Sequence, residues 1–550
     1  MLDQSKGVLS RNLTSVAADS KGTVFVGSRA GVDLVRDGKP VRSLVPKDGL
    51  NSTDVRSMGV GPDGRVWVGT SHGVTRYNGK EFSLRHSLRW LPGDEVRGVA
   101  FATDGSAWVA TNQGLSCIRS QTMTLAEKAA YYLDVVRKRH VREPGLVDHT
   151  RLRVPGDVST WEDMDTDNDG KYTGIYLAME SYRYAVTKAE DAKKNAAQAF
   201  RGLEFLQTVT RTPGFVARTV IPIDWKTMAD ANHTYTDQEV AEERVKDPRF
   251  RRMDQRWRPS ADGKWRWKGG TSSDETTGHF YAYALYYDLV AEGEEKTRVA
   301  RLVKRIMDHI IDGGYVFRDI DGEATRWGVW SPEKLNHDPD WSLERGCNSV
   351  EIIAYLTITK HVTGEAKYER EIEKLLKEHH YAENMLEPMS PYHDYFTYIG
   401  YDLLSMCYPA LLTYEKNPER VATYRKSLEA WYAPIKKDNS AQFSYIYAAH
   451  AEGEIPNQGC VDLLRDIPLD QIEWAIDNSH REDIKLVHRP AEDGWQTDRL
   501  LPPSERAVFR ADSNVYRAWN GNGGHEEGSC VAWLLPYWMG RYHGFIEGAK

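Results

Sequence analysis

Two adjacent carboxylates, Asp274 and Glu275, stand where the sequence best fits acid–base chemistry. His279 follows within about one helical turn, and the indoles of Trp265 and Trp267 lie shortly upstream. A pair of carboxylates beside flat apolar rings suits the proton transfers that cleave a glycosidic bond. The preceding serines also make this a capping-box pattern, which would close a helix N-terminus without any chemistry. The sequence leaves both interpretations open.

A second carboxylate from another part of the chain would complete such a reaction. Glu351, near the start of a predicted helix, and Glu526, in a glycine-rich stretch, are the candidates. Histidines occupy similar positions, because His393 and His525 stand near the starts of two other predicted helices. Together with His279, they could converge on a catalytic divalent metal such as zinc or manganese.

An acidic loop precedes the helix predicted from residue 172. Asp165, Asp167 and Asp169 alternate and are followed by Gly170, which matches the first half of a calcium-binding loop. The last position of that loop would be Tyr176 instead of the usual bidentate glutamate. The pattern predicts a structural Ca²⁺ site with an incomplete ligand set. Alternatives are an acidic cap on the helix and an aspartate that faces substrate.

Aromatic, basic and amide side chains in the long loops are candidates for holding a sugar. Indoles offer flat faces for sugar rings, and an arginine can pair with a substrate carboxylate. The predicted substrate-binding residues are Trp265, Trp267, Trp327, Trp330, Arg218, Arg345, Asn348 and Tyr398. Lys268 is a further candidate for holding a substrate carboxylate.

Twelve segments with helical periodicity must position these residues. Short turns pair most of them, which predicts six helical hairpins closing into an (α/α)6 toroid over residues 121–550. The expected ranges are 122–141, 172–187, 190–208, 276–292, 294–312, 346–363, 366–382, 393–415, 418–433, 440–452, 467–477 and 528–541. Long loops at 209–275, 313–345 and 478–527 would build a site at one end. An open helical array is the alternative.

The first 120 residues contain a different, repeated pattern. Thr23–Gly27, Arg65–Thr70 and Ala107–Thr111 are related strands, each preceded by a turn ending in glycine. Short strands repeating at about this interval are typical of propeller blades. The repeats resemble the two-component-regulator propeller family, and predict a small all-β domain of about three blades at 1–120. Propellers usually have four to eight blades. Further blades upstream, packing of the three blades against the rest of the chain, and oligomerisation through the incomplete propeller are the alternatives.

The helical part is similar to the broad group of (α/α)6-toroid carbohydrate enzymes. Asp167–Gly170 and Ser272–His279 carry this resemblance. It implies a mainly α fold and a carbohydrate-active enzyme. Glycoside hydrolysis of an oligosaccharide or polysaccharide, uronic-acid-containing ones included, is the first interpretation, with Asp274 or Glu275 as acid and Glu351 or Glu526 as base.

Three other functions remain open. The first is a polysaccharide lyase that performs β-elimination at uronate residues with a Tyr or His base. The residues that would carry it are His279, His393, Tyr398, Asn348 and His525. Sugar epimerisation is a weaker alternative. A non-catalytic carbohydrate sensor is the third, because repeats of this type commonly serve as periplasmic sensing modules in the family that they resemble.

Composition limits the partners and the location. The net charge of −8 and the lack of a basic stripe argue against nucleic acid. Five scattered cysteines without a CxxC pair argue against a zinc ribbon or a disulfide scaffold. No apolar run approaches the roughly 18 residues of a spanning helix, and residues 1–6 lack the apolar core of a signal peptide. We expect a periplasmic or secreted protein, with a cytoplasmic location as the alternative.

Overall fold

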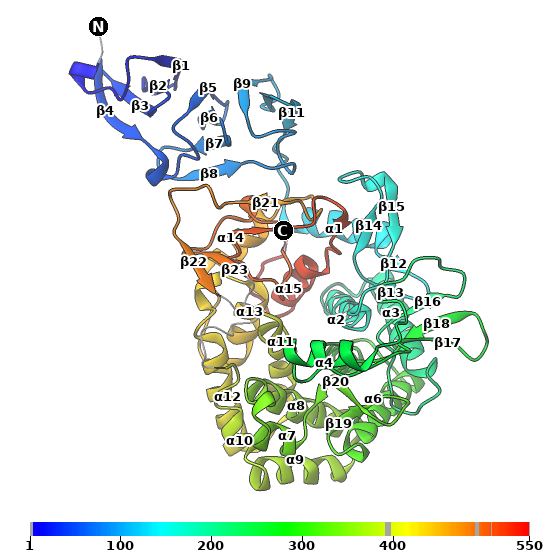
Figure 1. Cartoon of the computed structure of the whole chain (residues 1–550). Coiled ribbons are helices and arrows are strands. Elements are labelled where there is room, and N and C mark those ends of the chain that lie inside the picture. The colour runs from blue at the N-terminus through cyan, green and yellow to red at the C-terminus, as the bar shows by residue number, and fades with distance from the viewer. Residues whose placement is uncertain (1–3, 391–397, 490–493, 508, 549–550) are drawn as a thin grey trace.

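The computed structural model describes residues 4–390, 398–489, 494–507 and 509–548. It consists of three small β-sheets followed by a large helical body (Figure 1). This arrangement confirms the prediction of propeller-like blades ahead of an (α/α)6 toroid.

The three sheets are successive antiparallel blades. The first two have four strands in chain order, and the third has three described strands. Glycine occupies the turn between the first two strands of each blade at Gly22, Gly64 and Gly105, where φ is between +75° and +84°. Glycine is favoured there because this backbone region is strained for residues with a Cβ. The strands are β1 (Leu13–Ala18), β2 (Val24–Ser28), β3 (Gly31–Arg36), β4 (Lys39–Leu44), β5 (Val55–Val60), β6 (Val66–Thr70), β7 (Gly73–Tyr77), β8 (Phe82–Arg85), β9 (Val96–Phe101), β10 (Ala107–Thr111) and β11 (Gly114–Ile118).

Six inner helices form the wall of the toroid. Each packs against the next, and the last packs against the first, so the ring is closed. They are α2 (Asp169–Thr187), α5 (Ser273–Leu289), α8 (Arg345–Thr363), α11 (Tyr398–Tyr414), α13 (Ala441–His450) and α15 (Val531–Tyr542). Most of their residues are buried, because neighbours cover them on nearly every side.

Six outer helices each cover an inner partner. They are α1 (Leu125–Arg139), α3 (Glu190–Thr208), α6 (Glu294–Asp312), α9 (Ala366–Glu378), α12 (Pro418–Tyr432) and α14 (Gln458–Asp466). Helices such as α6 and α9 bury one apolar stripe and expose charged residues, which is the pattern that the sequence showed.

Two glycines allow the closest crossing in the ring, between α2 and α5. A Cβ on Gly174 would lie 2.5 Å from the carbonyl oxygen of Gly278, and a Cβ on Gly278 would lie 2.7 Å from the Cα of Lys171. These distances leave no room for a methyl group, so the crossing depends on both glycines.

One predicted helix is wrong. The range 467–477 is a loop that ends in β21 (Ile476–Asp477), and the outer helix of this hairpin is α14, which ends at Asp466. Pro468 explains the end of the helix, because the residue before a proline is disfavoured in the helical region. The start of the helix predicted at 393–415 lies outside the described residues up to 397.

Short elements decorate the loops between the large helices. They are α4 (Asp237–Lys246), α7 (Pro332–His337), α10 (Tyr381–Asn384), β12 (Val141–Arg142), β13 (Leu146–Val147), β14 (Thr150–Leu152), β15 (Trp161–Asp163), β16 (Val220–Pro222), β17 (Trp257–Pro259), β18 (Trp265–Lys268), β19 (Val316–Arg318), β20 (Ala324–Val329), β22 (Leu486–Arg489), β23 (Gly494–Thr497), β24 (Trp519–Asn520) and β25 (Glu526–Glu527).

The second blade and the loop between β8 and β9 connect the blades to the toroid. The backbone N–H of Leu84 donates to Glu505 at 2.8 Å, and the Trp90 indole donates to the carbonyl of Ser504 at 2.8 Å. The buried Arg89 side chain pairs with Asp470 at 2.9 Å. These contacts seat the peripheral strand β8 on the toroid.

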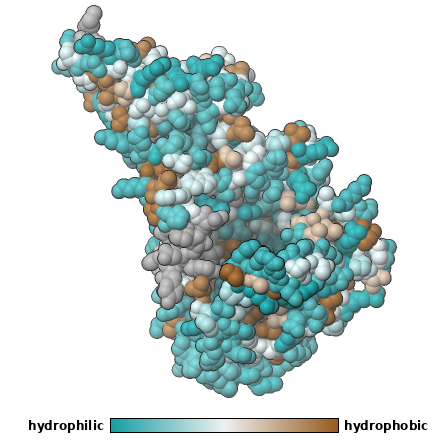
Figure 2. Space-filling model, in the orientation of Figure 1, coloured by the Kyte–Doolittle hydropathy of each residue, from teal (hydrophilic) through white to brown (hydrophobic). Residues whose placement is uncertain are grey.

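The surface drawn in Figure 2 is mainly hydrophilic, with apolar residues in separate small patches. Within the described part of the chain, no helix is long and apolar enough to cross a membrane.

Candidate active site

A cavity of about 740 Å³ opens at one end of the toroid. The first turns of α2, α5, α8 and α11 line it with Tyr172, Asp274, Asn348 and Tyr398. The loops before α2, α8, α11 and α15 supply the other walls. Polar side chains from distant parts of the chain therefore meet where four inner helices begin.

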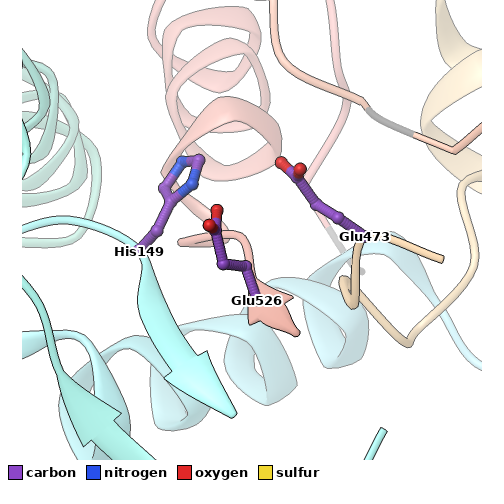
Figure 3. A group of neighbouring side chains, drawn as sticks. All are labelled: His149, Glu473 and Glu526. Carbon is purple, nitrogen blue, oxygen red and sulfur yellow. The ribbon is translucent and has the colours of Figure 1, made fainter. Parts of the chain in front are cut away.

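Three of these side chains, His149, Glu473 and Glu526, converge (Figure 3). One ligand-type atom of each lies within 4.8 Å of the other two. Pairing of β14 with β25 sets Arg151 opposite Glu526 and so brings His149 close. The backbone N–H of Glu473 donates to the carbonyl of Glu526 at 2.9 Å, which fixes the second carboxylate beside the first.

Arg510 lies beside this cluster. Its Nη1 is 3.5 Å from Nδ1 of His149 and 3.6 Å from Oε1 of Glu473, and its Nε is 3.4 Å from Asp512. Burial, followed by the charge of Arg510, lowers the pKa of His149 well below its usual range, so the ring is neutral at pH 7. Burial raises the pKa of Glu473, while Arg510 opposes that rise and Glu526 adds to it.

A buried ion-pair network supports the cavity floor. The Lys171 ammonium lies 2.9 Å from Asp512 and 3.0 Å from Asp402, and the hydroxyl of Tyr172 donates to Asp512 at 3.0 Å. Although burial lowers it, the two carboxylates hold the pKa of Lys171 well above its ordinary value. Lys171 is therefore a charged anchor that fixes Asp512 and, through it, Arg510.

The converging trio has the donor types of a divalent-metal site. Two carboxylates and an imidazole suit such an ion. However, the Arg510 guanidinium already faces two of the three donors, and a second positive charge there would be repelled. The donor set thus fits proton transfer better than a resident metal.

Five residues predicted from the sequence line the cavity: Asp274, Glu526, Trp327, Asn348 and Tyr398. Trp327 stacks under the Arg249 guanidinium at 4.4 Å. The amide of Asn348 donates to the carbonyl of Val329 at 2.8 Å. The hydroxyl of Tyr398 donates to Asp438 at 2.7 Å.

Glu275 lies outside the cavity and acts as the capping-box residue of α5. It accepts the backbone N–H of Ser272 at 2.9 Å and lies 3.4 Å from the Arg218 guanidinium. His279, one turn further, is buried and contacts the hydroxyl of Tyr283 at 3.2 Å, and burial lowers its pKa to about 3. The capping-box alternative that the sequence left open describes Glu275, and His279 is a buried residue of α5.

Glu351 is buried behind the cavity wall. It accepts the indole N–H of Trp330 at 2.7 Å, and burial raises its pKa to about 8. A neutral carboxyl that is hydrogen-bonded to a buried indole stabilises the helix packing. Neither Glu351 nor Trp330 lines the cavity.

The three aspartates of the predicted calcium loop have separate protein partners. Asp165 accepts the backbone N–H of Ala229 at 3.0 Å. Asp167 pairs with Lys268, Arg256 and Arg218, and Asp169 pairs with Arg142. These contacts form an ion-pair network around the loop, and the calcium site stays a prediction.

The remaining predicted residues lie apart from the cavity lining. Arg345 donates to the carbonyl of Leu335 at 2.8 Å. Trp265 packs on Phe205, Trp267 is buried, and the side chain of His525 is exposed. His393 lies outside the described residues. Of the predicted histidine trio, the two described members do not meet.

Sequence reasoning missed His149, Glu473, Arg510 and Asp512. Glu473 was hidden inside the wrongly predicted helix at 467–477. The adjacent Asp148 and His149, and the Arg510–Asn514 stretch with its alternating polar residues, were signals that could have been used. Their convergence depends on strand pairing between segments that are far apart in sequence.

The fold and the cavity define a propeller-bladed (α/α)6 toroid. The model of the two component regulator propeller family matches residues 49–72. Among curated proteins, none matches the chain.

Three solved structures are similar to parts of the chain. The extracellular domain of a hybrid two component system from B. thetaiotaomicron is 14% identical over 21% of this chain and 17% of that chain, with a TM-score of 0.18. This chain therefore spans less than a fifth of that domain. A sugar epimerase from a ruminal bacterium is 10% identical over 76% and 99% of the two chains, with a TM-score of 0.35. A family 76 glycoside hydrolase from a bovine B. thetaiotaomicron strain is 9% identical over 96% and 98%, with a TM-score of 0.27. At these values, none of them assigns an activity to this chain.

Proposed function

We propose that this protein is a carbohydrate-active enzyme, and specifically a glycoside hydrolase that works at the carboxylate pair Glu473 and Glu526. The observation that carries this proposal is the approach of the two carboxylates to within 4.8 Å in a cavity of about 740 Å³. A cavity of this size accommodates a short stretch of an oligosaccharide.

The two carboxylates have different surroundings, which suits two different roles. Burial raises the pKa of Glu473, which favours the protonated form that a general acid needs. It would donate its proton to the glycosidic oxygen as the bond to the anomeric carbon breaks. A carboxylate oxygen of Glu526 would attack that carbon, because the short separation favours a retaining reaction with a covalent intermediate. In the second step, water would attack the anomeric carbon and give a proton to the Glu473 carboxylate, and the bond between the sugar and Glu526 would break.

The charge of the cavity favours neutral sugars over uronates. Six carboxyl residues line it, against two arginines, and Arg510 is already engaged by Glu473 and Asp512. The basic residues predicted to hold a substrate carboxylate, Arg218, Arg345 and Lys268, do not line it. Trp327 and Trp341 in the wall offer faces for sugar rings.

A second candidate is β-elimination, which one observation favours. The neutral His149 ring could accept a proton, and Arg510 beside it could neutralise a uronate carboxylate. The hydroxyl of Tyr172 lies in the same cavity. This alternative requires an acidic substrate, which the carboxyl-rich lining disfavours.

The test is a screen of the purified chain against neutral and uronic-acid oligosaccharides, with reducing ends and ultraviolet absorbance measured together. Reducing ends without new absorbance, from neutral substrates, support the proposal. New absorbance from a C4–C5 double bond would replace it with elimination. No reaction across a broad panel would overturn the enzymatic assignment and favour the non-catalytic sensor. A location outside the cytoplasm remains part of the proposal, and fractionation of the native host tests it.

A further inference from the structure

The blades pack on one another through one repeated junction. In the first junction, Phe25 and Val32 of the first blade belong to one buried cluster with Val55 and Met58 of the second. Gly27 permits this approach, because a Cβ there would lie 2.7 Å from the side chain of Val55. One face of the first blade is thus covered by strand β5.

The second junction uses the equivalent residues of the next repeat. Trp67 and Val74 of the second blade share a buried cluster with Val96 of β9. The Trp67 ring meets Phe101 edge-on at 5.7 Å. Gly69 stands where Gly27 stands in the first junction, with Val96 against it. Each blade therefore buries this face on the first strand of the following blade.

The same face of the third blade is open. Trp108 and Leu115 occupy the positions of Trp67 and Val74, yet Trp108 is 37% and Leu115 is 62% exposed. Ala110 and Cys117 complete this face, because each pairs across the β10–β11 ladder with one of those two residues. We call these four residues the tail face.

The complementary surface is open on the first blade. In β1, Leu13 and Val16 occupy the positions that Val55 and Met58 hold in β5, as the register of each strand with its neighbour shows. Val55 and Met58 are buried, whereas Leu13 is 55% and Val16 is 67% exposed. We call Leu13 and Val16 the head strand. One chain thus carries both halves of an unformed junction.

We propose that two copies of this chain associate blade to blade, the tail face of each on the head strand of the other, and close a six-bladed ring. Six blades fall within the usual range for a closed propeller. Two identical head-to-tail junctions related by a two-fold axis satisfy both open surfaces at once. We infer that the partner is a second copy of this chain. Its strand β1 carries apolar residues at the positions that β5 uses in the first junction, and the equivalent face of a blade is already buried on such a strand in both junctions within the chain.

The orientation of the blades leaves room for such a ring. Figure 1 shows β1, β5 and β9, the first strands, on the side of the blades away from the toroid, while β8 contacts it. A ring closed on the free side would place the two toroids on opposite outer edges. Ala110 replaces the glycine of the other junctions, so the strands at this junction would lie slightly farther apart.

The experiment measures the mass of the full chain in solution by light scattering over a range of concentrations. We expect twice 62.6 kDa for the unmodified chain. Val16→Lys on the head strand and Leu115→Lys on the tail face should each weaken association at least roughly 100-fold, because an ammonium would be buried without a partner. Val16 and Leu115 are both exposed in the single chain, so the two variants should fold. Circular dichroism checks that they do. Val245→Lys, at an exposed position on α4, is the control and should leave the mass unchanged.

Mixing the two variants distinguishes this geometry from other dimers. In the mixed pair, one junction contains both lysines and the other contains none, so part of the association should return. A tail-to-tail dimer would instead survive Val16→Lys alone. A monomeric unmodified chain, open polymers or variants that remain dimeric would overturn the proposal. Hydrolytic activity is not measured, so this result is independent of the proposed function.

Discussion

The backbone N–H of Glu473 donates to the carbonyl oxygen of Glu526 at 2.9 Å, and their carboxylates approach within 4.8 Å inside the cavity. The hydrogen bond joins a loop after α14 to the strand that precedes α15. Because it joins the two backbones, the loop that carries Glu473 is held beside β25.

Removing either carboxylate should abolish most of the hydrolysis. Glu473→Gln and Glu526→Gln are each expected to lower kcat by roughly 10²–10⁴-fold, because one proton donor or one nucleophile is lost. Steady-state kinetics on the substrate found in the screen measure the effect. Glu454→Gln, at an exposed position, is the matched control. Full activity of both glutamine variants would rule out this carboxylate pair.

The activity should also depend on pH. Because burial raises the pKa of Glu473, activity should decrease as the pH rises through that pKa.

Glu351 should make stability depend on pH. Its folded pKa is about 8 against an ordinary 4.5, so the folded state keeps a proton that the unfolded state loses between these values. Stability should therefore fall as the pH rises from about 5 to 8, by up to about 1.4 kcal/mol per pH unit from this group. Urea unfolding at several pH values measures the slope. In Glu351→Gln the slope should be smaller, and an unchanged slope would show that Glu351 is ionised in the folded protein.

The crossing of α2 and α5 should not tolerate a methyl group. Gly278→Ala would place a Cβ 2.7 Å from the Cα of Lys171, so the helices must separate. We expect a loss of roughly 1–3 kcal/mol in the free energy of unfolding. Gly98→Ala is the control, because its Cβ would lie 3.7 Å from the Cβ of Ala110, an ordinary contact. Equal stability of the two variants would contradict the close crossing.

Chelation should leave the stability unchanged, because cationic side chains already neutralise Asp167 and Asp169. Thermal unfolding with EDTA and with added Ca²⁺ tests this expectation. By contrast, Asp167→Asn should cost roughly 1–3 kcal/mol, since the buried Lys268 would lose one of its two carboxylates. A large calcium-dependent increase in Tm would contradict this expectation and support the predicted calcium loop.

The sequence by itself determined the architecture of both parts. Helical periodicity in segments such as 190–208 and 294–312 and the repeat through Trp67 and Trp108 are local patterns, so they can be recognised without knowing what packs against them. These local patterns place eleven of the twelve predicted helices at approximately the right residues. The exception at 467–477 contains Pro468, a local signal that the periodicity concealed.

Only the tertiary structure decided which polar residues share the cavity. Asp274 and Glu275 are neighbours in sequence, yet a helix start turns one toward the cavity and the other into a capping box. His149 lies near Glu526 because β14 pairs with β25, and Glu473 lies near it because the loop that carries Glu473 is hydrogen-bonded to β25. Such long-range pairings have no local signature, because they depend on closure of the whole helical ring.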